Sequence, residues 1–413
     1  METEFQYRKP ERERPLQPEL RAVCQEIEQK IFPFFRVMSR NKHKNRAKIK
    51  LKPDFTIEDL YRAFYECRKG KRNSQSELEF EFDLESNMRK LYDDLKSGNY
   101  KIGKSICFVV LKPKPREVWA ATFRDRIVHH LIYNAIKDRF YSTFIKDTYS
   151  CIPKRGTLSA ARQVEKYARA ITKDYTREAY YLKADLKNFF VSIDKNILYE
   201  LVKEKVPEQW ILNLVHQIIF HNPQRSVIIQ SPGWKFDKLP YYKSLWNTPT
   251  CKGLPIGNLT SQFFSNIYLN SLDQYIKHKL NCKYYCRYVD DFVIMDVSPS
   301  RLNYLWLKIS DYILSNRMIN LHKDKRTVNF VRNGIDFVGY VIKPNRFFLR
   351  KCVIKRIFSI VKRFADSVYT LENGAIKKFK PVFTSYIGML GNTSGFLLKI
   401  LLTEQASFPF IYI

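Results

Sequence analysis

Apolar residues recur along the chain at two spacings, and each spacing predicts a different kind of element. Helical spacing predicts helices over the ranges 18–35, 56–69, 79–96, 126–140, 158–171, 195–205, 208–220, 260–280 and 302–316. Short apolar runs predict strands at 107–111, 180–185 and 335–342, and a β-hairpin over 284–295 whose turn contains Asp290 and Asp291. Thr56 opens the range 56–69 and Asp194 directly precedes the range 195–205, so we expect both to be N-caps. The chain is therefore predicted to mix helices and strands, and it shows no internal repeat.

Residues 222–252 interrupt this pattern. Four prolines fall within the range, at positions 223, 232, 240 and 249. Proline disrupts helices and central strands alike, so we predict a long irregular insertion. The sequence gives no physical basis for choosing between an insertion that shapes a channel and one that makes an oligomer contact.

The chain carries a large excess of positive charge. Among 413 residues, 72 Lys and Arg stand against 41 Asp and Glu, a net charge of +31. This excess indicates a polyanionic partner, and nucleic acid is the commonest polyanion. The densest basic segment, residues 36–50, holds seven Lys and Arg and no acid, so we expect an arm that binds phosphate; a solvated surface run is the alternative. The hydrophobic fraction of 45% is sufficient for packed cores, and the length predicts two or three modules.

Other features bear on where the protein works. No stretch approaches the about 18 apolar residues of a membrane span, so we expect no membrane association. The first residues alternate acids and bases, unlike a signal peptide, so we expect an intracellular protein. The eight cysteines are scattered, which disfavours disulfides. Only Cys282 and Cys286 lie close together, and without further ligands at zinc spacing we interpret them as small residues in or beside a strand.

Carboxylates stand at the edges of two apolar runs. Asp185 ends one predicted strand, and Asp290 and Asp291 lie in the predicted hairpin. Burying a carboxylate is costly without a cation to compensate it. Two adjacent aspartates in a turn, with a third from another strand, form a set of hard oxygen ligands suited to Mg²⁺. Taken alone, a turn with two solvated acids is the simpler interpretation, but the surrounding motifs favour a metal site.

Several motifs resemble those of reverse transcriptases and follow that family's order over about residues 55–345. Tyr288-Val-Asp-Asp291 resembles the catalytic box, and the segment around Asp185 resembles the first carboxylate motif. Further matches are Gly253-Leu-Pro-Ile-Gly257-Asn-Leu-Thr-Ser-Gln262, Lys114-Pro-Arg116, Phe123–His130, Leu321–Lys325 and Gly334–Tyr340. The resemblance implies an α+β right-hand polymerase with an antiparallel palm sheet and a helical thumb. The implied parts are an N-terminal helix and basic arm (1–54), fingers (55–180), a palm including the insertion (181–342), and a thumb with a C-terminal tail (343–413).

The resemblance also implies roles for individual residues. Asp185 and Asp290 should hold two Mg²⁺ ions, with Mn²⁺ as an alternative; Asp291 and the carbonyl of Leu186 should assist. Phe190 resembles the steric gate that excludes a 2′-hydroxyl and so selects dNTPs, with a core aromatic as the alternative. Other dNTP contacts are expected at Lys114 and Arg116 on the triphosphate, Gly257 near the base pair, and Lys325 as proton donor to pyrophosphate. Nucleic-acid contacts are expected at Arg124, Arg126, Lys355, Arg356, Lys362 and Arg363; Arg124 and Arg126 have pairing with Asp125 as an alternative.

Two departures from the common pattern narrow the resemblance. Ile256-Gly257 stands where most of the family has Gln-Gly, and Ser261-Gln262 where most have Ser-Pro. This version is similar to reverse transcriptases of diversity-generating retroelements and to an unclassified bacterial group that serves in phage defence. It implies low fidelity at template adenines, a cytoplasmic bacterial enzyme, and cDNA made from a dedicated noncoding RNA. The sequence does not decide between defence and diversification.

Other interpretations stay open. A group II intron-type enzyme is disfavoured because the chain after the thumb is short. For the same reason we expect no RNase H, integrase or endonuclease domain. A non-catalytic RNA-binding scaffold is disfavoured by the presence of all three carboxylates. Template-independent or protein-primed synthesis remains an alternative, since any of 26 tyrosines could prime. An accessory protein, a second polymerase or a second copy are candidate partners, and residues 408–413 either dock such a partner or pack on the thumb.

Overall fold

The computed structural model describes residues 53–69, 74–369 and 375–394. All of them belong to one compact unit of the chain, residues 50–413. The predicted helix 18–35, the basic arm 36–50 and the aromatic residues 408–413 lie outside the described ranges. Within those ranges, no helix combines the length and apolar character needed to cross a bilayer, and no disulfide joins the described cysteines.

The first described elements are helices α2 (Ile57–Arg68), α3 (Gln75–Phe82) and α4 (Leu84–Ser97). Thr56 caps α2 as predicted, because its hydroxyl accepts from the Asp59 N–H while the Asp59 carboxylate accepts from the Thr56 N–H. The single helix predicted over 79–96 is wrong. The chain leaves helical geometry at Asp83 (φ −130°, ψ 64°), and the two shorter helices bury separate apolar residues.

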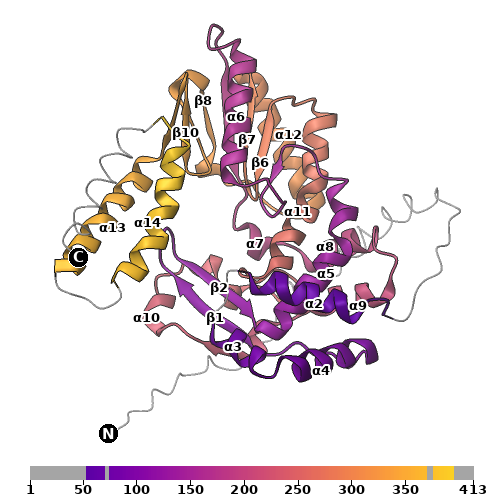
Figure 1. The fold of residues 1–413 in the computed structure, drawn as a ribbon. Helices are drawn as coiled ribbons and strands as arrows, with labels where there is room; N and C mark the ends of the chain where they lie inside the picture. The colour runs from indigo at the N-terminus through magenta and orange to yellow at the C-terminus, as the bar shows by residue number, and fades with distance from the viewer. Residues whose placement is uncertain (1–52, 70–73, 370–374, 395–413) are drawn as a thin grey trace, which may run out of the picture. The chain divides into compact units, whose positions relative to one another are not determined.

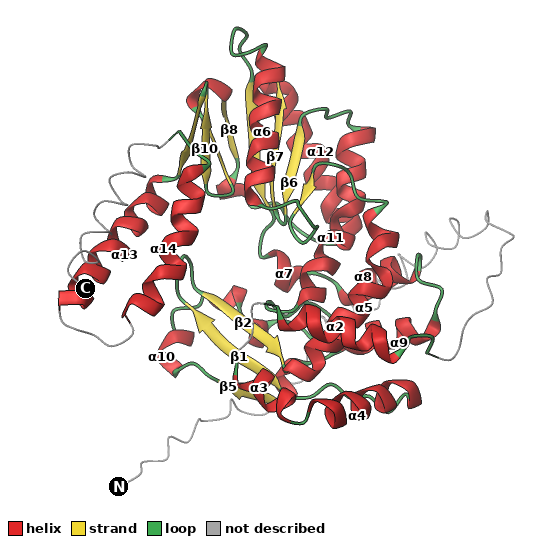
Figure 2. Ribbon diagram, in the orientation of Figure 1, coloured by secondary structure: helices red, strands yellow, loops and turns green. Residues whose placement is uncertain are grey.

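A three-stranded sheet has the order β2-β1-β5 (Figure 2). Its strands are β1 (Ser105–Val110), β2 (Arg116–Ala121) and β5 (Val227–Ile229). β1 confirms the predicted strand at 107–111, and β2 pairs with it antiparallel. β5 pairs with β1 in parallel and comes from the insertion, which is therefore less irregular than its prolines predict.

The second sheet has five strands in the order β3-β6-β7-β4-β8. They are β3 (Thr148–Tyr149), β4 (Tyr180–Asp185), β6 (Tyr285–Tyr288), β7 (Asp291–Asp296) and β8 (Thr327–Phe330). All neighbouring pairs are antiparallel except β3 with β6. The predicted hairpin is confirmed with one correction. Its turn holds Val289 and Asp290, while Asp291 already begins β7, because Asp291 pairs with Tyr288 across the ladder.

Helices cover both faces of this sheet. Helix α6 (Thr157–Thr172) packs on one face, and α11 (Leu259–Gln274) and α12 (Pro299–Arg317) pack on the other (Figure 1). Residues of β7 alternate between the two cores: Phe292 and Ile294 join the α11–α12 side, and Val293 joins the α6 side. This double burial explains why the strand reads as a continuous apolar run rather than as an alternating one.

The remaining helices are α5 (Phe123–Tyr141), α7 (Phe189–Ser192), α8 (Lys195–Lys203) and α9 (Gln209–Phe220), and a π-helical turn, Tyr275–Lys279, extends α11. Asp194 caps α8 as predicted, accepting from two backbone N–H groups of its first turn. His129 and His130 lie on α5, and His129 Nδ1 is 2.5 Å from the Thr260 hydroxyl.

The C-terminal part begins with a small sheet of β9 (Ile335–Phe337), β10 (Tyr340–Lys343) and β11 (Arg346–Leu349). The single strand predicted over 335–342 is wrong, because Val338 (φ 44°) and Gly339 (φ 95°) turn the chain back on itself. Helices α13 (Lys351–Tyr369) and α14 (Ala375–Gly391) follow and pack together through stacked rings of Phe364 and Phe379.

Candidate active site

The three predicted carboxylates meet at one end of the five-stranded sheet. Asp185 is the last residue of β4 and stands directly opposite Asp291, the first residue of β7. Asp290 lies in the adjoining turn, and its carbonyl accepts a hydrogen bond of 3.2 Å from the backbone N–H of Leu186. The structure therefore brings together all four residues predicted to surround a metal ion. It does so through backbone pairing, which fixes their position independently of side-chain rotamers.

Negative charge at this site is only partly compensated. Burial and, to a lesser extent, the neighbouring charges of Asp185 and Asp291 together raise the pKa of Asp290 to about 7. Burial likewise raises the pKa of Asp291. Lys325 forms an ion pair with Asp185 Oδ2, whereas Asp185 Oδ1 is buried without a hydrogen-bond partner. A buried, unpartnered carboxylate oxygen beside two further carboxylates is the arrangement that a bound cation relieves.

These donors fit a divalent cation chemically. All are hard oxygen atoms of the kind Mg²⁺ and Mn²⁺ prefer, and one of them lacks any partner. Across the described ranges, no three Asp, Glu, His or Cys side chains are already gathered in metal-binding geometry. Lys325 occupies one oxygen of Asp185, so binding of an ion there requires that ion pair to rearrange.

A buried guanidinium, not predicted from the sequence, forms a hydrogen bond with the turn that carries Asp290. Arg287 in β6 is fully buried and forms two hydrogen bonds with Asp273 of α11, at 2.7 and 2.6 Å. Its Nη1 also donates to the carbonyl of Val289 at 2.7 Å. Burial lowers the pKa of Arg287, but the charge and hydrogen bonds of Asp273 outweigh it and the net shift is upward. The sequence does contain a sign of this pair: Arg287 stands alone within an apolar strand, and a buried arginine requires an acidic partner.

Phe190 and Gly257 lie in two segments that are hydrogen-bonded to each other. Phe190 belongs to α7, and its carbonyl accepts from the Leu254 N–H at 2.9 Å. The Phe190 side chain is half-buried, and its ring centre lies 5.3 Å from the ring centre of the buried Phe189. This position is compatible with both a core aromatic and a partly exposed steric gate. Gly257 has φ +131°, and a Cβ there would lie 2.9 Å from Val118 Cγ1, so glycine is needed for the approach of β2.

The predicted cationic contacts are more dispersed. Lys114 and Arg116 are exposed where the β1–β2 connection enters β2, in the three-stranded sheet rather than beside the carboxylates. Arg124 forms ion pairs with Asp94 (2.8 Å) and Asp125 (3.3 Å), so the pairing alternative is present. Arg126 is partly buried, and burial lowers its pKa. On α13, Lys355, Lys362 and Arg363 are exposed and Arg356 is half-buried, and they form two pairs spaced seven positions apart along the helix.

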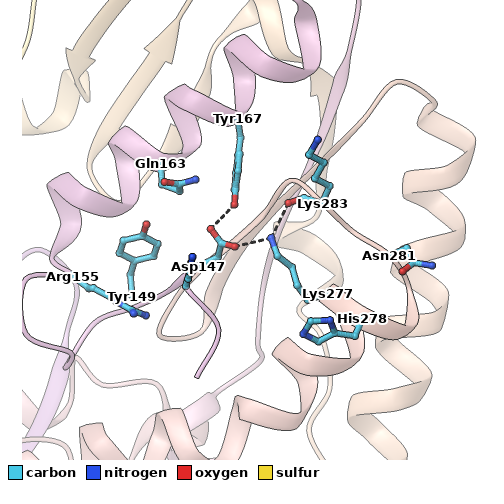
Figure 3. Close-up of a pocket in the computed structure, with 10 residues that line it drawn as sticks. Asp147, Tyr149, Arg155, Gln163, Tyr167, Lys277, His278, Asn281 and Lys283 are labelled. Atoms are coloured by element: carbon cyan, nitrogen blue, oxygen red, sulfur yellow. Dashed lines mark hydrogen bonds and ion pairs between the residues drawn. The ribbon is translucent and has the colours of Figure 1, made fainter. Parts of the chain in front are cut away.

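A cavity of about 770 Å³ opens at the β3 edge of the same sheet, away from these residues. None of the predicted catalytic side chains lines it. Figure 3 shows Tyr167 of α6 and Lys277 of the π-helical turn both directed toward Asp147, at 2.5 and 2.6 Å. These contacts tie the two helical layers together across the sheet edge, and we interpret the cavity as a structural junction rather than a reaction site.

Comparison with known proteins identifies the family. Residues 110–342 match the family model described as reverse transcriptase (RNA-dependent DNA polymerase). The match covers more than half of the chain and contains Asp185, Asp290 and Asp291. The chain therefore belongs to the reverse transcriptase family, whose enzymes generally use divalent metal ions, and the resemblance drawn from its motifs is confirmed at that level.

The similar curated proteins are distant. Protein YkfC of Escherichia coli is 22% identical over 284 residues, covering 60% of this chain and 69% of YkfC. The group II intron-encoded protein LtrA of Lactococcus lactis is 20% identical over 195 residues, covering 46% of this chain and 28% of LtrA. The putative COX1/OXI3 intron 2 protein of Saccharomyces cerevisiae is 19% identical over 275 residues, covering 53% of this chain and 29% of that protein. The chain thus spans less than a third of these two intron proteins.

Among solved structures, apo telomerase of Candida tropicalis lacking its C-terminal domain aligns with a TM-score of 0.45 and 11% identity, covering 60% of this chain and 55% of that one. Telomerase of Candida albicans with a fragment of telomeric RNA aligns with a TM-score of 0.42 and 12% identity, covering 78% of this chain and 63% of the telomerase chain. The right-hand α+β assignment rests instead on the family match and on the sheet topology of this chain.

Proposed function

We propose that the protein is an RNA-directed DNA polymerase that extends a primer with deoxynucleotides along an RNA template. The observation that carries this proposal is the meeting of Asp185, Asp290 and Asp291 at one sheet end, inside the family match. A carboxylate oxygen left buried without a partner supports a site that is complete only with a cation and substrate.

The residues divide the chemistry as follows. Asp185 and Asp290 hold the divalent ions, proposed to be Mg²⁺, with Asp291 and the Leu186 carbonyl assisting. When bound, such ions activate the 3′-hydroxyl and stabilise the leaving pyrophosphate. Lys325, already beside Asp185, is placed to give a proton to the pyrophosphate. Phe190 presents its exposed edge to the sugar and disfavours a 2′-hydroxyl.

Binding residues complete this proposal. Lys114 and Arg116 contact the triphosphate from the β1–β2 connection, which requires the three-stranded sheet to act as fingers over the palm. The stripe of basic residues on α13 contacts duplex backbone, as expected of a thumb. The proposed parts are fingers over 55–180, palm over 181–342 and thumb from 343 onward.

The finer role rests on two residues. At Ile256 and Gln262 the chain has the residues found in diversity-generating and defence-associated reverse transcriptases. We therefore propose that its template is a dedicated noncoding RNA. We also propose that it works in the bacterial cytoplasm, in either sequence diversification or phage defence. Sequencing of nucleic acids that copurify with the protein from its host identifies the template. A complementary DNA that disappears in an Asp290→Ala/Asp291→Ala variant supports the proposal.

The direct test is primer extension on an RNA template with purified protein. The wild-type chain should extend the primer, and Asp290→Asn should abolish extension. Asp311→Asn is the matched control, because Asp311 is an exposed aspartate on α12. Loss of extension in both variants contradicts the assignment of Asp290. DNA synthesis without template indicates untemplated or protein-primed synthesis, and RNA binding without synthesis indicates a scaffold.

A further inference from the structure

The insertion, residues 222–252, is folded onto the three-stranded sheet and has distinct inner and outer sides. It contains β5, the short helix α10 (Gly233–Phe236) and single 3₁₀ turns at Tyr241–Lys243 and Leu245–Asn247. On the inner side, Leu245 packs against Trp119 and Cys107 of the sheet. The buried carboxylate of Glu117 in β2 accepts hydrogen bonds from the Ser244 hydroxyl and the Leu245 N–H, which fixes the insertion in place.

Three large aromatic residues of the insertion take no part in this packing and are exposed. Trp234 is 55% exposed, Tyr241 75% and Tyr242 59%. These exposures are far above those of the inner residues, of which Leu245 is 7% exposed. A folded segment that buries one set of apolar residues and leaves three large rings in water indicates a surface with a binding role.

Lysines alternate with these rings. Lys235 Nζ lies 5.7 Å from the centre of the Trp234 ring, and Lys243 Nζ lies 5.8 Å from that of Tyr242. Over the whole insertion, five basic residues stand against one acid, Asp237. We call Trp234, Lys235, Tyr241, Tyr242 and Lys243 the aromatic–lysine surface.

This surface belongs to the same assembly as the motif resembling the template and dNTP contact. A Cβ on Gly253 would lie 2.8 Å from Leu245 Cδ1, so the insertion packs directly on the start of that motif. Three residues further along the motif, the Ile256 carbonyl accepts from the Trp119 N–H at 2.7 Å. Trp119 in turn contacts Trp246 of the insertion, with ring centres 4.9 Å apart.

We propose that the aromatic–lysine surface binds single-stranded nucleic acid by stacking unpaired bases on its rings and pairing its lysines with phosphates. This proposal rests on the proposed polymerase function in one respect: the strand bound at the surface is the part of the template that has not yet been copied. Exposed rings accept any base because every base has a π-face, and lysines supply contacts to the backbone that are independent of sequence.

A second copy of the chain or another protein fits the same surface less well. The cores of protein interfaces are enriched in aromatic residues but depleted in lysine. Here lysines lie within cation–π distance of two of the three rings, so a protein partner would have to desolvate them. A polyanion with exposed bases satisfies both parts of the surface together.

The test measures binding of a fluorescein-labelled oligouridylate of about 16 nucleotides to the full chain by fluorescence anisotropy. Replacing the rings with Trp234→Ala/Tyr241→Ala/Tyr242→Ala should weaken binding by about tenfold or more. Tyr304→Ala is the matched control, because Tyr304 on α12 is 54% exposed and also lies under a lysine, Lys308 at 5.6 Å. This control should leave binding unchanged.

A second variant separates charge from stacking. Lys235→Ala/Lys243→Ala keeps the rings and should reduce the slope of log K against log salt by about 1.4, at about 0.7 per phosphate contact. Unchanged affinity in the ring variant and unchanged slope in the lysine variant would together overturn the proposal. Loss of self-association in the ring variant, with normal strand binding, would also overturn it and would assign the surface to a protein contact.

Primer extension distinguishes this proposal from the proposed function. The ring variant should extend normally on templates with a one-nucleotide overhang and poorly on templates with a long overhang. If the wild-type chain does not polymerise but its oligouridylate binding depends on the rings, the polymerase assignment fails and the surface stands. If both variants polymerise and bind as the wild type does, the surface fails and the polymerase stands.

Discussion

Arg287 donates a 2.7 Å hydrogen bond from its buried guanidinium to the carbonyl of Val289, the residue immediately before Asp290. Val289 has φ +56°, a left-handed conformation that is unfavourable for a β-branched residue. The turn that presents Asp290 is therefore held in a strained shape by a side chain from the preceding strand. Such strain persists only where surrounding contacts fix it, which makes Arg287 a positioning residue for the carboxylates.

Replacing Arg287 should separate this positioning role from stability. Arg287→Met leaves the buried Asp273 carboxylate without an oppositely charged partner and should destabilise the fold by about 3–5 kcal/mol. Asp273→Asn/Arg287→Met removes both charges and should recover most of that loss in urea unfolding. Primer extension should stay low in the double variant, with kcat reduced more than KM, because nothing then holds the Val289 carbonyl. Full recovery of kcat along with stability would show that Arg287 serves the fold alone.

Lys325 is expected to act as a proton donor as well as an ion-pair partner. Lys325→Ala removes both roles and should slow nucleotide addition by about 10²–10⁴-fold. Lys325→Arg keeps the charge beside Asp185 but is a poor donor, because an arginine does not release its proton in proteins, so it should be nearly as slow. Single-turnover primer extension measures the rate of nucleotide addition by both variants. Lys323→Ala, an exposed lysine in the same turn, should behave as the wild type. A fast Lys325→Arg variant would reduce the role of this residue to charge.

Gly257 should tolerate no side chain. Its Cβ would lie 2.9 Å from Val118 Cγ1 and 3.1 Å from the Trp119 carbonyl oxygen, in a conformation that L-residues rarely adopt. Gly257→Ala should therefore cost about 1–3 kcal/mol and lower extension together with stability. Gly98→Ala is the comparison, since Gly98 has φ +78° but no atom within 4 Å of a Cβ. Equal losses in urea unfolding for the two variants would show that the crowding against β2 is unimportant.

Glu117 should make stability depend on pH. Burial raises its pKa above the ordinary 4.5, so the folded state binds a proton more tightly than the unfolded state. Stability is therefore higher below that range and falls as the pH rises from about 4.5 through the raised pKa. Glu117→Gln cannot ionise, and its amide can still hydrogen-bond the Ser244 hydroxyl, so its stability should decline less than that of the wild type. Parallel stability curves from urea unfolding at pH 4 to 7 in about unit steps would contradict this assignment.

Fidelity tests the finer resemblance. Ile256 stands where most reverse transcriptases have glutamine, and the similar diversity-generating enzymes misincorporate at template adenines. The wild-type chain should therefore misincorporate more often opposite adenine than opposite uracil in sequenced extension products, and Ile256→Gln should reduce the difference. Equal error rates at both template bases would remove low fidelity from the proposal while leaving polymerase activity unaffected.

The three carboxylates proposed to be catalytic could be located from sequence because each stands at the edge of an apolar run, where burial without compensation is costly. The family resemblance supplied their order and roles. The pair of Arg287 and Asp273 could not be found in this way, because its members lie 14 positions apart on a strand and a helix. Only the packing of α11 against the sheet brings them together.

The missed strands have a different cause. β2 begins with Arg116 and Glu117, which read as a polar loop, and Glu117 is buried only because the insertion covers it. β5 has only three residues and lies within the proline-containing insertion, so its strand character comes from pairing with β1 rather than from local preference. The divided helix at Asp83 and the turn at Gly339 likewise depend on neighbouring elements rather than on composition.

The pairing of β5 with β1 has a consequence for how the protein is made. The two strands meet across a long stretch of chain: the Ser231 hydroxyl that bonds the Val109 N–H lies 122 positions further on. During synthesis, β1 and β2 leave the ribosome and can form their hairpin long before β5 exists. Until then, one edge of β1 carries unpaired backbone groups, the kind of edge that recruits other chains. Pairing β5 with β1 closes a long loop of chain, and the entropy of that closure opposes the pairing, so completion of the sheet is expected late in folding. Substitutions that slow this closure should lower the yield of folded protein even where they leave the finished molecule unchanged.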